Sequence, residues 1–261
     1  MLTKINDILF DVELDGPENA PAVTLSHSLS TNLRAWDDLV EMLLPKYRVL
    51  RYSMRGHGKS EPVSGPYSLK GLVGDIAAIQ DYFGISKSHF VGLSIGGMIA
   101  QAYALEFPAR LKKLVISSSL CRLSESAEAM WKKRIKAIEK SGIEAIVEPT
   151  IKRWFAEETR KAAHPVIDRT RAFIRETSEE GYVGCCQAIS KLNLFDRLKQ
   201  ITAPTLVIVG QDDKGTPVAA SEIIHHQIPN SELLIVNKAS HQVAMEQPKI
   251  FNSAVLGFLG K

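Results

Sequence analysis

Short apolar runs recur along the chain, and each has the length of a buried β-strand. The clearest of these runs are 22–25, 47–52, 89–91, 114–117, 205–209 and 232–236. Helix-like segments at 36–44, 72–83 and 95–107 follow the first three runs, and Pro108 ends the last of them because proline cannot continue a helix. Strands that alternate with helices predict an α/β fold, in which helices cover both faces of a mostly parallel sheet. Ligands of such sheets bind at the carboxyl ends of the strands.

The pattern changes between residues 121 and 195. There, apolar residues recur at helical spacing among many charges, and no convincing strand is present. We interpret this segment as a helical lid inserted before the acid-bearing strand, above a core formed by residues 1–120 and 196–261. A chain of 261 residues, 45% of them hydrophobic, fits a single domain with a large core.

Ser94 lies between a strand-like run and a helix-like run, in the pattern Gly92-x-Ser94-x-Gly96. This is the sequence form of a nucleophile elbow. A serine hydroxyl is a poor nucleophile at neutral pH, so it needs a sharp turn that exposes it, a base that takes its proton and N–H donors for the oxyanion. A match of this length also arises by chance, and the context is what favours a catalytic serine.

A nucleophilic serine also needs an acid and a histidine. Candidates for both follow Ser94 in the chain, in the order acid and then histidine, which is the order in an α/β-hydrolase. Asp212 and Asp213 both come just after the apolar run 205–209, and either could be the acid. His241 follows the last predicted strand. The other histidines fit less well, because they lie in a predicted turn, on a predicted surface helix or before the aspartates in the chain.

An oxyanion hole needs two backbone donors. The N–H group of Ile95, directly after the nucleophile, is the first candidate, because it lies at the positive end of the following helix. The second candidate is the N–H group of Leu29, in the loop 26–31 that follows the first predicted strand. The alternative interpretation of this loop is an ordinary turn rich in serine and threonine.

With these residues, the chain resembles α/β-hydrolases along its whole length, and within them it most resembles the 3-oxoadipate enol-lactonases of protocatechuate and catechol degradation. The segments that carry the resemblance are 27–37, 50–60, 92–98, 131–135, 180–186 and 215–217. The two lid segments, Trp-x-x-Arg-Ile and Gly-Tyr-x-Gly-Cys-Cys, are the most discriminating. Elbow, acid and histidine are shared with esterases, dehalogenase-like enzymes and cofactor-free haloperoxidases.

The resemblance implies an α/β-hydrolase fold and a Ser-His-Asp triad without metal or organic cofactor. The family's spacing of glycine, acid and proline selects Asp213 as the acid and leaves Asp212 as a turn residue. The implied reaction is hydrolysis of a small carboxylated enol-lactone, 3-oxoadipate enol-lactone, to 3-oxoadipate. Two positions depart from the family pattern: Ser28 stands where glycine is common, and Ser53 stands where aspartate is usual.

A carboxylated substrate calls for a cation in the lid. Arg134 falls in the middle of a predicted apolar stripe that comprises Met130, Trp131, Ile135, Ala137 and Ile138, whereas four lysines fall on the opposite helix face. A buried arginine needs a partner, which is either a structural acid or an anionic ligand. Trp131 and Trp154 are candidates for the pocket wall, with packing in the core as the alternative.

Composition narrows the class of protein. A net charge of +3 is too small to indicate nucleic-acid binding. No run approaches the roughly 20 apolar residues that span a membrane, and the first residues lack the apolar stretch of a signal peptide, so we expect a cytoplasmic enzyme. Cys121, Cys185 and Cys186 lack metal-ligand spacing and are expected to be buried thiols. The oligomeric state is left open.

Three rival functions would use the same fold. A carboxylesterase or another lactonase would keep the triad without a preference for anionic substrates. A cofactor-free perhydrolase or haloperoxidase would use the triad on an acetate ester and peroxide. A ligand-binding receptor of this fold would bind its ligand tightly but turn over about one equivalent.

Overall fold

The computed structural model describes residues 1–124 and 129–261, and residues 125–128 lie outside the described part of the chain. In that part, the strands form one sheet in the order β1-β2-β4-β3-β5-β6-β7-β8. Strands β1 and β2 run antiparallel to their neighbours, and the others are parallel. The strand bounds are β1 Leu2–Ile5, β2 Ile8–Asp15, β3 Ala22–Ser26, β4 Arg48–Tyr52, β5 Ser88–Leu93, β6 Leu111–Ser117, β7 Thr205–Gly210 and β8 Ser231–Val236.

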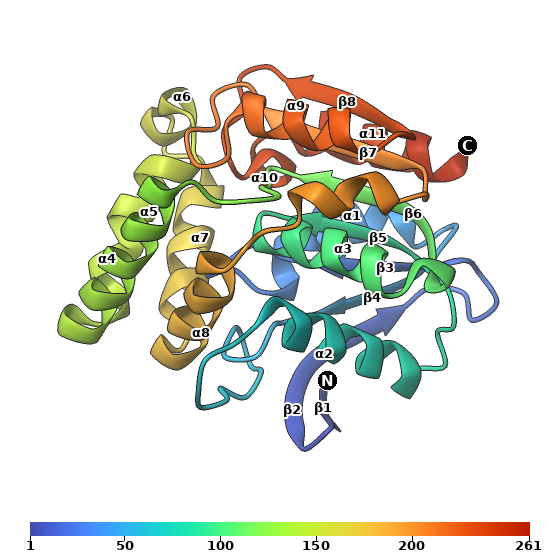
Figure 1. Cartoon of the computed structure of the whole chain (residues 1–261), viewed down its shortest axis with the longest axis horizontal. Coiled ribbons are helices and arrows are strands. Elements are labelled where there is room, and N and C mark those ends of the chain that lie inside the picture. Colours follow the sequence, from blue (N-terminus) through green and yellow to red (C-terminus); the bar gives the residue numbers. More distant parts are fainter.

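Helices cover both faces of the sheet, as the sequence predicted. The core helices are α1 Asp37–Leu43, α2 Leu69–Tyr82, α3 Ile95–Glu106, α9 Val218–Gln227, α10 Val243–Glu246 and α11 Pro248–Gly260. Alternate residues of the strands point to opposite faces. Phe90 of β5 packs in one apolar cluster with residues of α2, α3 and α9, whereas Val91 packs in a second cluster with residues of α1 and α11. Figure 1 shows α2 and α3 on the face of the sheet toward the viewer.

The structure confirms the six predicted strands and the three predicted core helices, with bounds that differ by at most three residues. Strands β1 and β2 were not predicted. Both lie at the edge of the sheet, and buried positions along them alternate with exposed or half-buried ones. A search for continuous apolar runs finds strands that are buried on both faces and misses half-buried strands of this kind.

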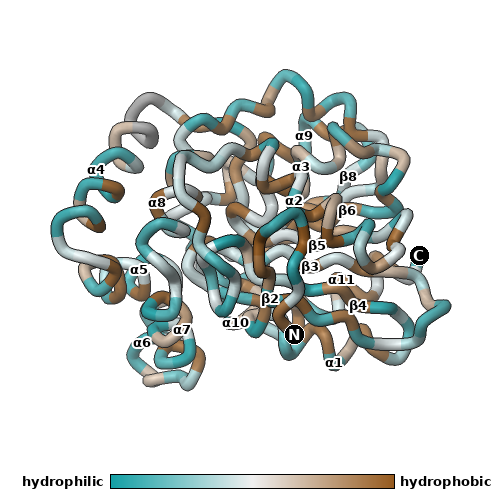
Figure 2. Tube along the Cα trace, turned by 90° about the horizontal axis from the view of Figure 1, so that it is seen from below, coloured by the Kyte–Doolittle hydropathy of each residue, from teal (hydrophilic) through white to brown (hydrophobic). Residues whose placement is uncertain are grey.

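The segment 121–195 is helical where the structure describes it. Its helices are α4 Glu125–Ser141, α5 Val147–Trp154, α6 Glu157–Lys161, α7 Pro165–Arg175 and α8 Glu179–Ser190. They lie together at one end of the molecule, at left in Figure 1 and again at left in the view of Figure 2. The two ends of the segment meet, because Leu194 N–H donates to Cys121 O at 2.7 Å and Leu123 N–H donates to Leu192 O at 3.3 Å. The segment 121–195 therefore leaves the core and rejoins it at neighbouring positions.

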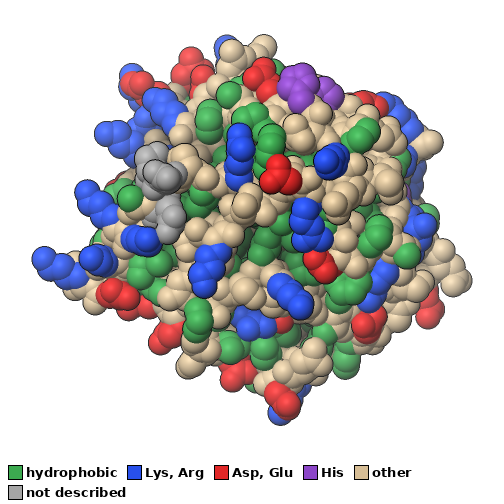
Figure 3. Space-filling view, viewed as in Figure 1, with side chains coloured by type: hydrophobic (Ala, Val, Ile, Leu, Met, Phe, Trp, Pro, Cys, Tyr) green, Lys and Arg blue, Asp and Glu red, His purple; other side chains and the backbone are tan. Residues whose placement is uncertain are grey.

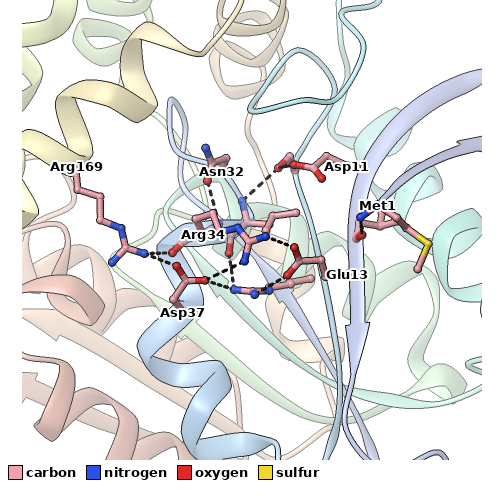
Figure 4. A network of polar contacts seen from close by, with 11 residues as sticks. Met1, Asp11, Glu13, Asn32, Arg34, Asp37 and Arg169 are labelled. Atoms are coloured by element: carbon pink, nitrogen blue, oxygen red, sulfur yellow. Dashed lines mark hydrogen bonds and ion pairs between the residues drawn. The ribbon is translucent and has the colours of Figure 1, made fainter.

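A network of charges ties one lid helix to the core (Figure 4). Arg169 of α7 donates to the carboxylate of Asp37 at 2.9 Å and to the carbonyl of Arg34. Asp37 also pairs with Arg51 of β4, which in turn pairs with Glu13 of β2. These contacts connect β2, β4 and α1 to the lid. Arg51 is buried, so water screens its ion pairs less than it screens the more exposed pair of Arg169 with Asp37.

No helix among the described residues is both long and apolar enough to cross a lipid bilayer. The three cysteines are free and buried, as expected from the sequence. Burial raises the pKa of the Cys186 thiol to about 12, so this side chain is held as a neutral thiol.

Candidate active site

Ser94 sits in a sharp turn between β5 and α3. Its backbone has φ 58° and ψ −117°, a combination that non-glycine residues rarely adopt and that costs on the order of 1–3 kcal/mol. Neighbouring elements hold the turn: Ser94 N–H donates to Ser117 O at 2.9 Å, and Ser119 Oγ donates to Ser94 O at 2.8 Å. The predicted nucleophile elbow is therefore present in the structure.

The two motif glycines permit this turn because other backbone atoms approach them closely. A Cβ atom on Gly92 would lie 2.2 Å from Gly96 O, and one on Gly96 would lie 2.2 Å from Ser26 O. Real Cβ atoms do not approach carbonyl oxygens so closely. The pattern Gly-x-Ser-x-Gly is thus a packing requirement of the elbow and of its contact with β3.

Ser94, His241 and Asp213 form a continuous hydrogen-bonded chain. His241 Nε2 lies 2.9 Å from Ser94 Oγ, and His241 Nδ1 lies 2.9 Å from Asp213 Oδ2. All three residues are at most 8% exposed. The three loops come from the carboxyl ends of β5, β7 and β8, where a parallel sheet collects its ligands.

The structure brings Asp213, and not Asp212, to the histidine. Asp213 Oδ1 accepts N–H bonds from Gly215 and Thr216, and its Oδ2 accepts the Thr216 hydroxyl at 2.6 Å. Burial opposes ionisation of Asp213, but His241 and the Thr216 donors outweigh it and lower the pKa of the carboxyl. Asp212 is exposed. Thr216 was not singled out in the sequence, although its position three residues after an aspartate is typical of a side chain that closes such a turn.

The loop after β3 carries the second candidate oxyanion donor next to the elbow. Strands β3 and β5 are paired, with Ser26 opposite Gly92, so their loops meet at one edge of the sheet. Within the described residues, neither Leu29 N–H nor Ile95 N–H donates to another protein group. Both groups are buried, which leaves them available to a substrate oxygen.

His27 holds this loop from below. Its Nδ1–H donates to Ser28 O at 2.8 Å, and its Nε2 accepts Met54 N–H at 2.9 Å. Burial, and to a lesser extent the nearby His57, lowers the pKa of His27 to about 3. A neutral ring with one donor and one acceptor nitrogen is what these two contacts require. His27 is therefore a structural support of the loop 26–31, which carries the candidate oxyanion donor Leu29.

Ser28 stands where glycine is common in the family. Both its hydroxyl and its carbonyl group form hydrogen bonds. Its Oγ accepts from Gln242 Nε2 at 2.9 Å and lies 3.1 Å from Thr31 Oγ1. Thr31 Oγ1 also donates to Ser28 O at 2.9 Å. The side chain therefore connects the oxyanion loop to the residue that follows His241. Gln242 was not identified in the sequence, because only the folded chain brings positions 28 and 242 together.

Ser53 is the second departure from the family pattern, and its hydroxyl contacts the carboxylate of another residue. Ser53 Oγ accepts Leu33 N–H at 3.3 Å and donates to Asp11 Oδ2 at 3.3 Å. Asp11 of β2 thus supplies a carboxylate next to position 53, where the sequence analysis expected an aspartate. Since β2 was not predicted, this substitution of one acid for another could not be inferred from the sequence.

Lid residues lie against His241. The Trp154 ring centroid is 5.7 Å from that of His241, and Trp154 O accepts Gln242 N–H at 3.2 Å. Glu246, which the sequence analysis did not single out, accepts N–H bonds from Ala156 and Ser240. These contacts place Trp154, buried and 5% exposed, at the wall of the site.

The predicted apolar stripe of α4 is narrower than expected. Trp131 and Ile138 are buried and Ile135 is partly buried, but Met130 is 41% exposed and Ala137 is also exposed, so the prediction for these last two residues is wrong. Helix α4 is the outermost lid helix in Figure 1 and packs mainly against α8. A helix with one principal neighbour buries a narrower strip than the helical-wheel pattern assumes.

Arg134 remains on the buried side of α4 and is half-buried. Its guanidinium lies over the Trp131 ring, 4.8 Å from the centroid, in a cation–π contact. It forms no ion pair with any carboxylate in the part of the chain that the structure describes. The structural acid that was one of the two expected partners is thus not found there. The outward face of α4 carries the predicted lysines, and Lys and Arg side chains are prominent at this end of the molecule in Figure 3.

Within residues 1–124 and 129–261, no group of three or more His, Cys, Asp or Glu side chains is arranged to hold a metal ion. The site brings together a hydroxyl in hydrogen-bond contact with a histidine, an acid behind the histidine and two N–H groups that have no acceptor among the described residues.

Comparisons with known proteins agree with this geometry. Residues 21–142 match a family model described as alpha/beta hydrolase fold, and residues 173–261 match one described as TAP-like protein. The 3-oxoadipate enol-lactonase 2 of Acinetobacter baylyi is 32% identical over 95% of this chain and 92% of its own length. The chain belongs to the α/β-hydrolase family. Its fold and its relatives make it a hydrolase of that family.

Two further relatives bear on the substrate. The solved enol-lactonase of Burkholderia xenovorans superposes with a TM-score of 0.96 at 30% identity and covers all of both chains. A putative 2-succinyl-6-hydroxy-2,4-cyclohexadiene-1-carboxylate synthase of Bacillus subtilis is 30% identical over 99% of this chain and 97% of its own length. This α/β-hydrolase thus has relatives of similar identity with different named activities.

Proposed function

We propose that this α/β-hydrolase opens a small carboxylated enol-lactone, 3-oxoadipate enol-lactone, by nucleophilic catalysis. The observation that carries the proposal is the chain of 2.9 Å contacts from Ser94 through His241 to Asp213, next to two free N–H donors. The relatives named enol-lactonase support the choice of substrate.

In the proposed first step, His241 Nε2 takes the proton of Ser94 Oγ as the oxygen attacks the lactone carbonyl. Asp213 accepts the hydrogen bond from Nδ1–H, which holds the ring tautomer and stabilises the imidazolium. Leu29 and Ile95 N–H groups stabilise the oxyanion. The ring C–O bond then breaks and releases an enolate-like oxygen, which is a good leaving group. The enolate takes up the proton held by the His241 imidazolium and becomes the ketone, so His241 is neutral again before the second step.

In the second step, His241 activates a water molecule that attacks the acyl group on Ser94. The free carboxylic acid leaves and the serine regains its proton. The lowered pKa of Asp213 supports this role, because an ionised acid is available behind the histidine over the whole neutral range. The chemistry requires no cofactor.

The carboxylate of the substrate is assigned to Arg134. This half-buried guanidinium lacks a described acidic partner, and the Trp131 ring beneath it limits its freedom. Trp131 and Trp154 would form apolar walls between the anion site and the triad. This assignment separates the proposed function from that of a general carboxylesterase of the same fold.

Active-site labelling tests the serine mechanism. A serine-directed phosphonate should inactivate the enzyme with one equivalent bound, and peptide mass spectrometry should place it on Ser94. The variant His241→Ala should react far more slowly with the same reagent. Labelling elsewhere, or full activity after Ser94 is labelled, would contradict the proposal.

A further inference from the structure

Arg153, in the last turn of α5, lies beside the acid and histidine of the site. A Cβ atom added to Gly215 would lie 3.7 Å from Arg153 Cδ, 3.4 Å from Asp213 Oδ1 and 3.7 Å from His241 Nδ1. The arginine stem thus borders the same small space as the Asp–His pair. Its backbone is joined to the histidine loop as well, since Ser240 Oγ donates to Arg153 O at 3.4 Å.

The guanidinium of Arg153 has no acidic partner in the described part of the chain. The side chain is half-buried, and the nearby Asp213 carboxylate is already occupied by His241 and by donors from Gly215 and Thr216. Burial, followed by the charge of Arg134, lowers the pKa of Arg153. Two guanidinium groups that repel each other without an acid between them form an unfavourable arrangement unless an anion binds.

Tyr182 of α8 adds an unused donor to this arrangement. It is 1% exposed, and its hydroxyl has no nitrogen or oxygen partner among the residues that the structure describes. Its polar neighbour is the thiol of Cys186, which is a weak acceptor. Both Arg134 and Arg153 act on this hydroxyl electrostatically. A buried hydroxyl near two cations that have no acidic partner in residues 1–124 and 129–261 is suited to donate to a shared anion.

The surroundings of Arg153 also favour the approach of an anion. Its side chain borders an open cleft of about 510 Å³. Lysine and arginine side chains outnumber acidic ones in the lining, which comprises the cations Lys152, Arg160, Lys161, Lys214 and Lys238 and the acids Glu157, Glu158 and Asp212. A cleft bordered by cations raises the local concentration of anionic substrate and its rate of association.

We propose that Arg153, with the Tyr182 hydroxyl, completes with Arg134 a carboxylate-binding site and makes Arg153 a specificity-determining residue. The substrates it selects are esters or lactones with a carboxylate a few bonds from the reacting carbonyl. The inference rests on the proposed function, and it assigns recognition of the anion to three lid helices, α4, α5 and α8.

Three substrates separate the possible roles: 3-oxoadipate enol-lactone, the carboxylated ester mono(4-nitrophenyl) glutarate and neutral 4-nitrophenyl acetate. Arg153→Met should lower kcat/KM for the two carboxylated substrates by about 10- to 100-fold, the effect of losing a charge-assisted hydrogen bond, mainly through KM. Hydrolysis of the acetate should change by less than about twofold. Arg153→Lys should recover part of the loss because it keeps the charge but not the planar fork. Tyr182→Phe should cause a smaller loss in the same direction.

The control is Lys136→Met, which removes an exposed cation from the outward face of α4, outside the cleft, and should leave all three rates nearly unchanged. Equal losses on neutral and carboxylated substrates in Arg153→Met, without recovery in Arg153→Lys, would show a structural role and overturn the inference. An unchanged preference in Arg153→Met would also overturn it, while leaving the proposed function intact if the wild type opens the enol-lactone. A wild type inactive on the enol-lactone would overturn the proposed function itself.

Discussion

Gln242 Nε2 donates a hydrogen bond to Ser28 Oγ across 2.9 Å. Ser28 precedes the proposed oxyanion donor Leu29, and Gln242 follows the proposed base His241. The bond therefore links the two loops whose relative position sets the distance between base and oxyanion hole. Both residues are at most 1% exposed, so water does not compete for the contact.

Removing this link should slow catalysis without weakening substrate binding. We expect Ser28→Ala and Gln242→Ala each to lower kcat about 2- to 10-fold with little change in KM, because a hydrogen bond of this kind contributes about 0.5–1.5 kcal/mol. The double variant should lose little more than either single variant, since both remove the same bond. Fully additive losses in steady-state kinetics would show that the two residues act separately.

The choice between the two adjacent aspartates can be tested directly. Asp213→Asn should lower kcat by roughly 10⁴-fold, because the amide favours the wrong histidine tautomer. Asp212→Asn should change kcat by less than about threefold, since Asp212 is exposed and makes no contact with His241. A larger loss in Asp212→Asn than in Asp213→Asn would overturn the assignment of the acid.

Two buried neutral histidines should make stability depend on pH. Burial lowers the pKa of His27 to about 3 and that of His57 to about 4, from an ordinary value of 6.5. Between the folded pKa values and 6.5, the unfolded chain binds more protons than the folded chain. The free energy of unfolding is therefore highest above about pH 6.5 and falls as the pH decreases toward 4. Each histidine contributes a slope of up to about 1.4 kcal/mol per pH unit.

Urea unfolding at pH 7, 6 and 5 measures this slope. The variant His57→Asn should show a shallower slope than the wild type, even if its stability at pH 7 is lower. An identical slope in the variant would mean that His57 does not titrate on unfolding.

Asp11 already supplies a carboxylate next to position 53, so a second carboxylate at that position should destabilise the fold. Ser53 is fully buried, and Asp11 Oδ2 lies 3.3 Å from its hydroxyl. Ser53→Asp should lower the free energy of unfolding by about 1–3 kcal/mol, because it places two carboxylates together. Adding Asp11→Asn should recover most of the loss in thermal or urea unfolding. No recovery would indicate that the added side chain is excluded by its size rather than by its charge.

The sequence predicted the strands that are buried on both faces, and it predicted the residues that are recognised by their spacing to near neighbours in the chain. Ser94 and its glycines are recognisable because the elbow is a local turn, and strands such as β5 are apolar because helices cover both faces. The contacts of Ser28 with Gln242 and of Ser53 with Asp11 join positions far apart in the chain, so no local pattern reveals them. Arg153 was not singled out for the same reason: only the folded chain brings its side chain near Asp213 and His241.

The most direct test of the account is the initial rate of loss of the enol-lactone chromophore with 3-oxoadipate enol-lactone, measured beside 4-nitrophenyl acetate and with Ser94→Ala as the control. We predict rapid opening of the enol-lactone, slow hydrolysis of the acetate and a loss of roughly 10⁴-fold or more on both in Ser94→Ala. Efficient acetate hydrolysis with little action on the enol-lactone would instead indicate a general esterase and would contradict the proposed substrate.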